Sequence, residues 1–136
     1  MKAVLIDTGP IVALIDRGDA DHTPCVQQTK QLRGSLLSTW PVITEAMYLL
    51  ADVPEGQDAL LGKVESGDIE IAALTAEDVA PMRQLIRKYQ DLPMDFADAS
   101  VVRVAQRDGL DTVFTLYRTD FQVYRRDRGR PFRIIP

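Results

Sequence analysis

Short apolar segments alternate along this chain with longer segments that have the residue spacing of helices. Such an alternation is typical of β-α-β units, in which helices cover both faces of a parallel sheet and leave its strands apolar throughout. The length of 136 residues suits one domain of this kind. We therefore predict an α/β fold, with one domain over residues 1–136, three α/β/α layers and a mostly parallel sheet of four or five strands.

Residues that are typical of helix starts and helix ends divide the chain into the predicted elements. A proline in the first turn, a Thr or Asp before a helix and a glycine after it mark the helix ends. Helices are expected over residues 8–16, 23–33 (closed by Gly34), 40–51, 75–89 and 95–107, with another starting at Pro54. Strands are expected over residues 3–6, 36–38, 69–73, 112–115 and 132–135, the third being either an edge strand or the arm of a hairpin.

The chain has one cysteine, Cys25, and one histidine, His22. These counts exclude an internal disulfide, a multi-cysteine zinc site and a histidine-rich metal site. Cys25 is expected on a helix face, and His22 is expected to act neither as a ligand nor as a base. No apolar run approaches the ~20 residues of a membrane span, and the run after Lys2 is too short for a signal peptide. We expect a cytoplasmic protein with no membrane partner.

The net charge of −4 hides an uneven distribution. Residues 118–133 hold six arginines and two aspartates, which gives 6 − 2 = +4 and leaves −8 for the rest. This segment fits a phosphate-binding rim beside an acidic body, and it fits a solvated arginine-rich loop equally well.

Two carboxylates stand in places that favour a role in chemistry. Asp7 directly follows the first predicted strand, and ligands of open α/β sheets bind outside the carboxyl ends of the strands. Its alternative role is to cap the next helix. Glu45 lies in a helix that is apolar on nearly every side, so we expect this helix to be largely buried. A buried glutamate is rare unless it binds a metal or pairs with a cation such as arginine, and the metal is favoured here.

A second pair of carboxylates begins the predicted helix over residues 95–107. Asp95 and Asp98 are three residues apart and share a helix face, where they repel each other unless a cation neutralises them. The alternative is a capping role for Asp95 and a favourable first-turn position for Asp98. Asp7, Glu45 and Asp98 come from three separate elements and offer the oxygen ligands that Mg²⁺ prefers.

Four segments of the chain resemble, in the same order, the motifs of PIN-domain proteins, especially VapC-type toxins of bacterial toxin–antitoxin pairs. The resemblance spans nearly the whole chain. The segments are Asp7-Thr8-Gly9-Pro10, Thr39-Trp40-Pro41-Val42-Ile43-Thr44-Glu45-Ala46, Asp95-Phe96-Ala97-Asp98-Ala99-Ser100, and Val113-Phe114-Thr115-Leu116 with Asp120-Phe121.

The resemblance implies a set of metal-binding acids made of Asp7, Glu45 and Asp98. In the family pattern a fourth acid follows the fourth strand, and here Tyr117 holds that position. Asp120, three residues later, also matches the pattern and is a candidate fourth catalytic acid. Asp95 is a candidate metal ligand that compensates for the loss.

The resemblance further implies a Mg²⁺- or Mn²⁺-dependent endoribonuclease, the toxin of a type II pair, with an RNA substrate, a cognate antitoxin and a homodimeric state. Tyr48 or Leu49 is expected at the subunit or antitoxin interface. The alternative is a degenerate PIN domain that has lost turnover through Tyr117 and only binds RNA or a partner. A phosphoacceptor receiver domain is disfavoured, because no lysine directly follows the strand over residues 112–115.

Overall fold

The computed structural model describes residues 2–136, which form one five-stranded sheet, seven α-helices and two 3₁₀ turns. The strands are β1 (Val4–Ile6), β2 (Leu36–Ser38), β3 (Ile69–Ile71), β4 (Thr112–Phe114) and β5 (Arg133–Ile135). The helices are α1 (Thr8–Ile15), α2 (His22–Gln31), α3 (Trp40–Leu49), α4 (Gly56–Glu65), α5 (Val79–Lys88), α6 (Phe96–Asp108) and α7 (Arg118–Val123), and the turns are η1 (Ala76–Asp78) and η2 (Asp127–Gly129).

The sheet has the strand order β3-β2-β1-β4-β5, and every pairing in it is parallel. All residues of the central strand β1 and of its neighbour β4 are buried, as expected for strands covered on both faces. The predicted α/β class and the mostly parallel sheet of four or five strands are confirmed, with five strands present. β3 is a parallel edge strand, so the hairpin alternative for this segment is wrong.

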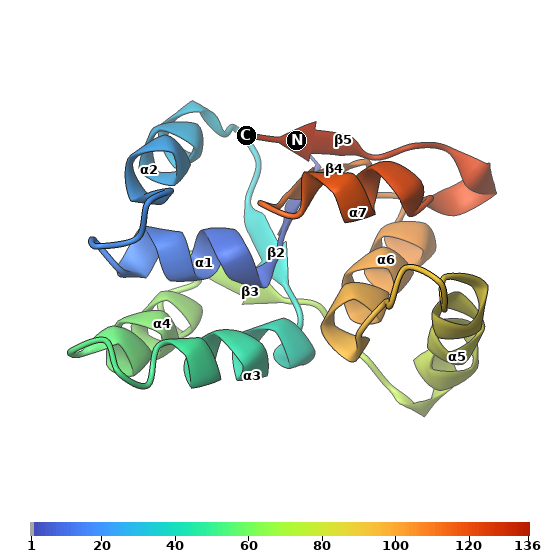
Figure 1. The fold of residues 1–136 in the computed structure, drawn as a ribbon, viewed down its shortest axis with the longest axis horizontal. Helices are drawn as coiled ribbons and strands as arrows, with labels where there is room; N and C mark the ends of the chain where they lie inside the picture. Colours follow the sequence, from blue (N-terminus) through green and yellow to red (C-terminus); the bar gives the residue numbers. More distant parts are fainter. Residues whose placement is uncertain (1) are drawn as a thin grey trace.

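The helices form a layer on each side of the sheet (Figure 1). α1 to α4 lie on one side, where they pack against one another, and α5 to α7 lie on the other. This division follows from the strand order. Right-handed crossovers that run from β1 to β3 place their helices on one face, and the return to β4 and β5 places the later helices on the opposite face.

Two predicted boundaries differ from the structure for identifiable reasons. α2 begins at His22 and already ends at Gln31, so Gly34 does not close it. Gly34 is needed because a Cβ atom there would lie 2.2 Å from the Lys2 carbonyl oxygen. The arginine-rich segment, for which no helix was predicted, contains α7 and η2.

The prediction that α3 is largely buried is wrong. Val42, Ile43 and Ala46 are buried, but Tyr48 is 80% exposed and Leu49 is 48% exposed. The helix lies in an outer layer, where it packs against α1, α4 and α6 and leaves its other side to solvent. Within residues 2–136, no helix is long and apolar enough to cross a lipid bilayer.

The strand order places a crevice at one point of the sheet. The chain runs outward from β1 through β2 to β3, and then returns to the other side of β1 to form β4 and β5. Ligands of open α/β sheets bind where the strand order reverses in this way, outside the carboxyl ends of the strands. Here that point lies between β1 and β4, directly beyond Ile6 and Phe114.

Candidate active site

Asp7 lies at this crevice, immediately after β1, and is only 2% exposed. Its backbone N–H donates to the Phe114 carbonyl (2.9 Å), and its Oδ2 accepts a hydrogen bond from the Thr115 hydroxyl (3.1 Å) across the gap between β1 and β4. It occupies the N-cap position of α1, but its side chain makes no capping hydrogen bond. Burial raises the pKa of Asp7 to about 6, and the charges of Glu45 and Asp95 raise it as well.

Asp98 and Asp95 face the same crevice from the start of α6. The Asp95 Oδ1 accepts from the Asp98 N–H (2.7 Å), and the Asp98 Oδ2 accepts from the Asp95 N–H (3.3 Å), so the capping role considered for Asp95 is confirmed. The Tyr124 hydroxyl also donates to the Asp98 Oδ2 (3.3 Å). The pKa of Asp98 is raised to about 7. Burial is the largest cause, and the negative charges of Asp7 and Asp95 are the next largest.

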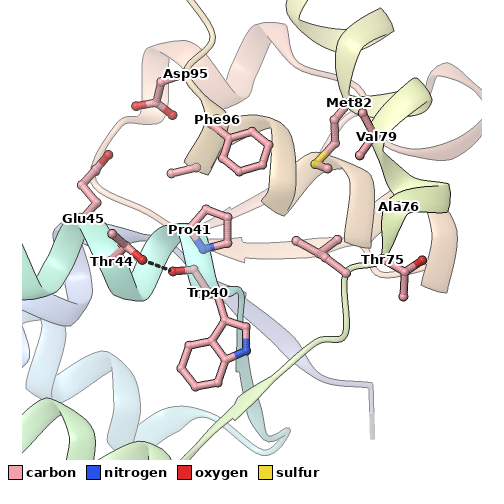
Figure 2. A pocket seen from close by; sticks show the side chains of 12 residues that line it. Trp40, Pro41, Thr44, Glu45, Thr75, Ala76, Val79, Met82, Asp95 and Phe96 are labelled. Carbon is pink, nitrogen blue, oxygen red and sulfur yellow. Dashed lines mark hydrogen bonds between the residues drawn. The ribbon is translucent and has the colours of Figure 1, made fainter.

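Glu45 approaches from α3, where it is half-buried. In Figure 2 its carboxylate points toward that of Asp95. The ion pairs within residues 2–136 do not include Glu45, so the alternative of a glutamate paired with arginine is wrong for this part of the chain. The charge of Glu45 instead helps to raise the pKa of Asp7.

The charges of all four carboxylates act on Tyr117. The phenol is 52% exposed, burial of part of it raises its pKa, and the charges of Asp7, Glu45, Asp98 and Asp95 raise the pKa further. The Tyr117 N–H donates to the Thr115 hydroxyl oxygen (3.0 Å), which ties the start of α7 to the partner of Asp7. Asp7, Glu45, Asp95 and Asp98 thus all act electrostatically on Tyr117; that they form one metal site stays a prediction.

Asp120 faces a different neighbour. It lies in the first turn of α7, and its charge acts on Tyr124, whose pKa is raised chiefly by burial. The arginines around it are largely committed to contacts within the chain. The side chains of Arg118, Arg125, Arg126 and Arg130 donate to carbonyl oxygens, and Arg126 and Arg130 also pair with Asp127. In the described residues, only Arg128 and Arg133 of the six have side chains without such a partner.

Several hydroxyl residues that the sequence did not single out position the acids. Thr115 holds Asp7, while Thr39 caps α3 and shares a buried hydrogen bond (2.7 Å) with Ser100 of α6. That bond joins the helix of Glu45 to the helix of Asp98. Thr39 directly follows β2, as predicted, so its position after a strand was a usable indication; Thr115 directly follows β4 but had been predicted as the last residue of that strand.

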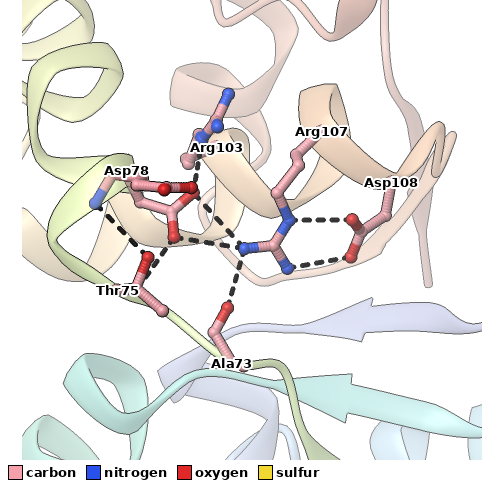
Figure 3. Close-up of polar contacts among 7 residues, drawn as sticks. Ala73, Thr75, Asp78, Arg103, Arg107 and Asp108 are labelled. Atoms are coloured by element: carbon pink, nitrogen blue, oxygen red, sulfur yellow. Dashed lines mark hydrogen bonds and ion pairs between the residues drawn. The ribbon is translucent and has the colours of Figure 1, made fainter.

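An ion-pair network holds the outer side of α6 (Figure 3). Asp78, which is 3% exposed, accepts from the Arg103 Nε (2.8 Å) and from the Arg107 Nη1 (3.3 Å). Its Oδ2 also accepts from the Thr75 N–H (2.9 Å), which confirms the predicted N-cap pair of Thr75 and Asp78. Arg107 further pairs with Asp108. The network fixes α6, which carries Asp98, against the start of α5.

The oxygen atoms of these acids are the type of ligand that a hard divalent cation prefers. They belong to carboxylates, which suit Mg²⁺ and Mn²⁺, and the raised pKa values show that the acids lack a positive charge to stabilise them. The hydroxyl of Thr8, next to Asp7, is buried and has no hydrogen-bond partner in residues 2–136. Within the same residues, however, no three Asp, Glu, His or Cys side chains are already arranged to hold an ion. In this arrangement the side chains of Asp95 and Asp98 each accept a hydrogen bond from the other residue's backbone N–H.

The remaining two residues of interest have structural roles. The His22 Nδ1 donates to the Ala13 carbonyl (2.7 Å) and so joins α2 to α1. Cys25 is fully buried on α2, and burial raises the pKa of its thiol to about 11, which disfavours the reactive thiolate. Both observations agree with the roles expected from the sequence.

Comparisons with known proteins identify the family and the fold of the chain. The family model described as PIN domain matches residues 4–125. Ribonuclease VapC26 of Mycobacterium tuberculosis is 29% identical over 135 residues, which cover 98% of this chain and 100% of that protein.

Solved structures of lower identity share the fold. The structure of M. tuberculosis VapC20, described as a sarcin-ricin loop cleaving toxin, has a TM-score of 0.75 at 18% identity and covers 81% of this chain and 86% of its own. VapBC2 from Rickettsia felis, bound to a DNA fragment from its promoter, has a TM-score of 0.71 at 12% identity, covering 99% and 100%. A toxin–antitoxin complex from Klebsiella pneumoniae has a TM-score of 0.67 at 16% identity, covering 98% and 96%.

Proposed function

The chain belongs to the PIN domain family, and on that premise we propose that it is a metal-dependent endoribonuclease, the toxin of a type II toxin–antitoxin pair. The observation that carries this proposal is Asp7, a buried carboxylate at the switch point of the sheet with other acids around it and no cationic partner in residues 2–136. The relative of 29% identity that is named a ribonuclease supports RNA as the substrate.

In this proposal Asp7, Glu45 and Asp98 hold the ion, with Asp95 as a further ligand. When bound, Mg²⁺ or Mn²⁺ lowers the pKa of a coordinated water and stabilises the charge that develops on the phosphate. Thr115 keeps the Asp7 carboxylate turned toward the gap between β1 and β4 through its hydrogen bond. The hydrogen bond between Thr39 and Ser100 keeps the helices of Glu45 and Asp98 at a fixed separation.

The partners follow from the same premise. A toxin–antitoxin complex is among the structures that share this fold, which supports a cognate antitoxin as a partner. We further propose that residues 1–136 act as one domain in the cytoplasm, as a homodimer, with the exposed Tyr48 and Leu49 at the subunit or antitoxin interface.

One observation favours a second candidate function. Tyr117 stands where the family pattern has an acid, and its phenol provides no negative charge at neutral pH, since its ordinary pKa of about 10 is raised further here. A PIN domain that has lost turnover in this way would still bind RNA or a partner protein.

Incubation of the purified protein with single-stranded RNA separates the two functions. Cleavage that requires Mg²⁺ or Mn²⁺, stops in EDTA and is absent in Asp98→Asn supports the ribonuclease, because Asn keeps the shape of the side chain and removes its charge. RNA binding without cleavage under either metal supports the binding module. Cleavage that persists in Asp98→Asn would contradict the assigned site.

A further inference from the structure

A large apolar pocket, whose lining includes Glu45 and Asp95, has a volume of about 740 Å³. It lies between the start of α3, the segment after β3 and the start of α6. In Figure 2, Glu45 and Asp95 lie together at one end of the pocket, Trp40, Pro41 and Phe96 line its length, and Met82 lies at the far end. Volumes between about 300 and 1,000 Å³ are typical of sites for small organic groups.

Two aromatic side chains line this pocket and remain uncovered. Trp40 and Phe96 are each 56% exposed, although Trp, Phe and their apolar neighbours in the pocket would be stabilised by burial. Trp40 is the only tryptophan of the chain; it lies at the start of α3, whereas Phe96 lies at the start of α6. Exposed aromatic rings at a nucleic-acid site are the surfaces on which unpaired bases stack.

Charge decides which part of an RNA chain can enter. No Lys or Arg lines the pocket, and the carboxylates of Glu45 and Asp95 lie at one end, so the interior repels a phosphate group. A neutral, flat and largely apolar group can enter. Because Glu45 and Asp95 belong both to the pocket and to the acidic site, a phosphate held at the acids places its own nucleoside at the mouth of the pocket.

We propose that this pocket binds one unpaired nucleobase of the RNA, stacked on Trp40 and Phe96, next to the phosphodiester that is cut. The proposal rests on the proposed function and deepens it, because it restricts the substrate to RNA whose base beside the cleaved bond is single-stranded. A base inside a duplex is stacked and paired on both sides and does not reach the pocket.

Fluorescence of Trp40 tests the proposal without any need for cleavage. Trp40 is excited at the long-wavelength edge of the tryptophan absorption band, where tyrosine does not absorb. Its emission is measured in the presence of Ca²⁺ and a short single-stranded RNA. We expect this RNA to quench the emission, whereas the same RNA annealed to its complement and an abasic oligomer of equal length do not. Binding of end-labelled single-stranded RNA that leaves Trp40 unquenched would overturn the proposal.

Two substitutions measure the contribution of stacking. Trp40→Leu and Phe96→Leu are expected to weaken binding of the single-stranded RNA about tenfold or more, which corresponds to about 1.4 kcal/mol per stacked base. Trp40→Phe retains a ring and should recover most of the affinity. Leu61→Ala is the matched control, because Leu61 is an apolar residue of similar exposure (47%) on α4, outside the pocket. Circular dichroism checks that each variant is folded.

The outcomes separate this inference from the proposed function. RNA cleavage that is unaffected by Trp40→Leu and Phe96→Leu overturns the inference and leaves the ribonuclease intact. Quenching by single-stranded RNA in a protein that cuts no RNA supports the base pocket and overturns the ribonuclease. A second copy of the chain could instead occupy the pocket. In that case the Trp40 emission would shift to the blue as the protein concentration rises without RNA, and Trp40→Leu would dissociate the dimer. These two results together would overturn the inference.

Discussion

At the scale of single residues, the carboxylates of Asp7 and Asp98 are held in a protein environment that disfavours their charge. Burial is the largest cause in both cases, and the neighbouring acids add repulsion. The pKa rises to about 6 for Asp7 and to about 7 for Asp98. Folding without a cation therefore costs free energy at neutral pH, because carboxylates that are ionised in the unfolded chain must either keep their charge in an unfavourable place or take up a proton.

This cost predicts an unusual dependence of stability on pH. A carboxyl group whose pKa is higher in the folded than in the unfolded protein binds its proton more tightly when folded. The resulting stabilisation is complete below a pH of about 4 and is lost as the pH rises through about 6 for Asp7 and about 7 for Asp98. Urea denaturation of the metal-free protein should show that the free energy of unfolding falls over this range.

Asp7→Asn should remove much of that fall. The amide keeps a hydrogen-bond acceptor for Thr115 and carries no charge, so the metal-free variant should be more stable at pH 7 by up to about 3 kcal/mol. Added Mg²⁺ or Mn²⁺ should stabilise the wild-type protein at pH 7 and leave Asp7→Asn unaffected. If Asp7→Asn is less stable than the wild type at pH 7 without metal, the folded protein stabilises the charge of Asp7 and this prediction is wrong.

Tyr117 is the residue whose replacement should increase activity. Tyr117→Asp adds a carboxylate at a position on which the charges of the four acids act, and we expect tighter binding of Mn²⁺ and a rate of RNA cleavage at least about tenfold higher, equivalent to about 1.4 kcal/mol of the barrier. Titration calorimetry and cleavage under saturating metal measure the two effects.

Two controls interpret this substitution. Tyr117→Phe removes only the hydroxyl and should leave the rate unchanged. If Tyr117→Asp has no effect while Asp120→Asn abolishes cleavage, Asp120 is the fourth acid and the assignment of Tyr117 is wrong.

At the scale of elements, Asp78 joins the start of α5 to α6 through Arg103 and Arg107. Hydrogen bonds from Thr75 and Arg103 lower the pKa of Asp78, so its stabilisation is present above a pH of about 4 and is lost as the pH falls below that value. Asp78→Asn should lower the free energy of unfolding at pH 7 by about 3 kcal/mol, since it leaves two partly buried guanidinium groups without their carboxylate.

Asp108→Asn is the matched control for this network. Its side chain is 39% exposed and it pairs with Arg107 alone, so the loss should stay below about 1 kcal/mol. Urea denaturation compares the two variants. Equal losses in both would show that the burial of Asp78 contributes nothing.

The elements also show what the sequence allows one to predict. β1 and the position of Asp7 after it were predictable, because a short apolar run followed by an acid is a local pattern. The exposure of Tyr48 was not predictable from the apolar character of α3, since a local pattern does not say which layer a helix occupies. The hydrogen bond between Asp7 and Thr115 joins residues 108 positions apart, and only the sheet topology brings them together.

At the scale of the whole molecule, the exposed end of α3 is the feature that calls for a partner. Tyr48→Asp should disrupt assembly with the second copy or the antitoxin, weakening it about tenfold or more, while the fold is unchanged because the side chain is 80% exposed. Light scattering measures the dimer, and co-purification measures the antitoxin complex. Val123→Asp, which alters an exposed residue of α7, is the control. A monomeric wild type whose antitoxin still binds Tyr48→Asp would refute this interface.

The position of the edge strand β5 late in the chain affects when the support of Asp7 can be completed during synthesis. Its Ile135 carbonyl accepts from the Thr115 N–H (3.0 Å), and Thr115 in turn holds Asp7. Translation proceeds at about 5–20 residues per second, so Asp7 leaves the ribosome on the order of ten seconds before β5 does. During that time the nascent chain carries its acids without the strand that completes their support. The topology therefore delays the completion of this support until β5 has been synthesised.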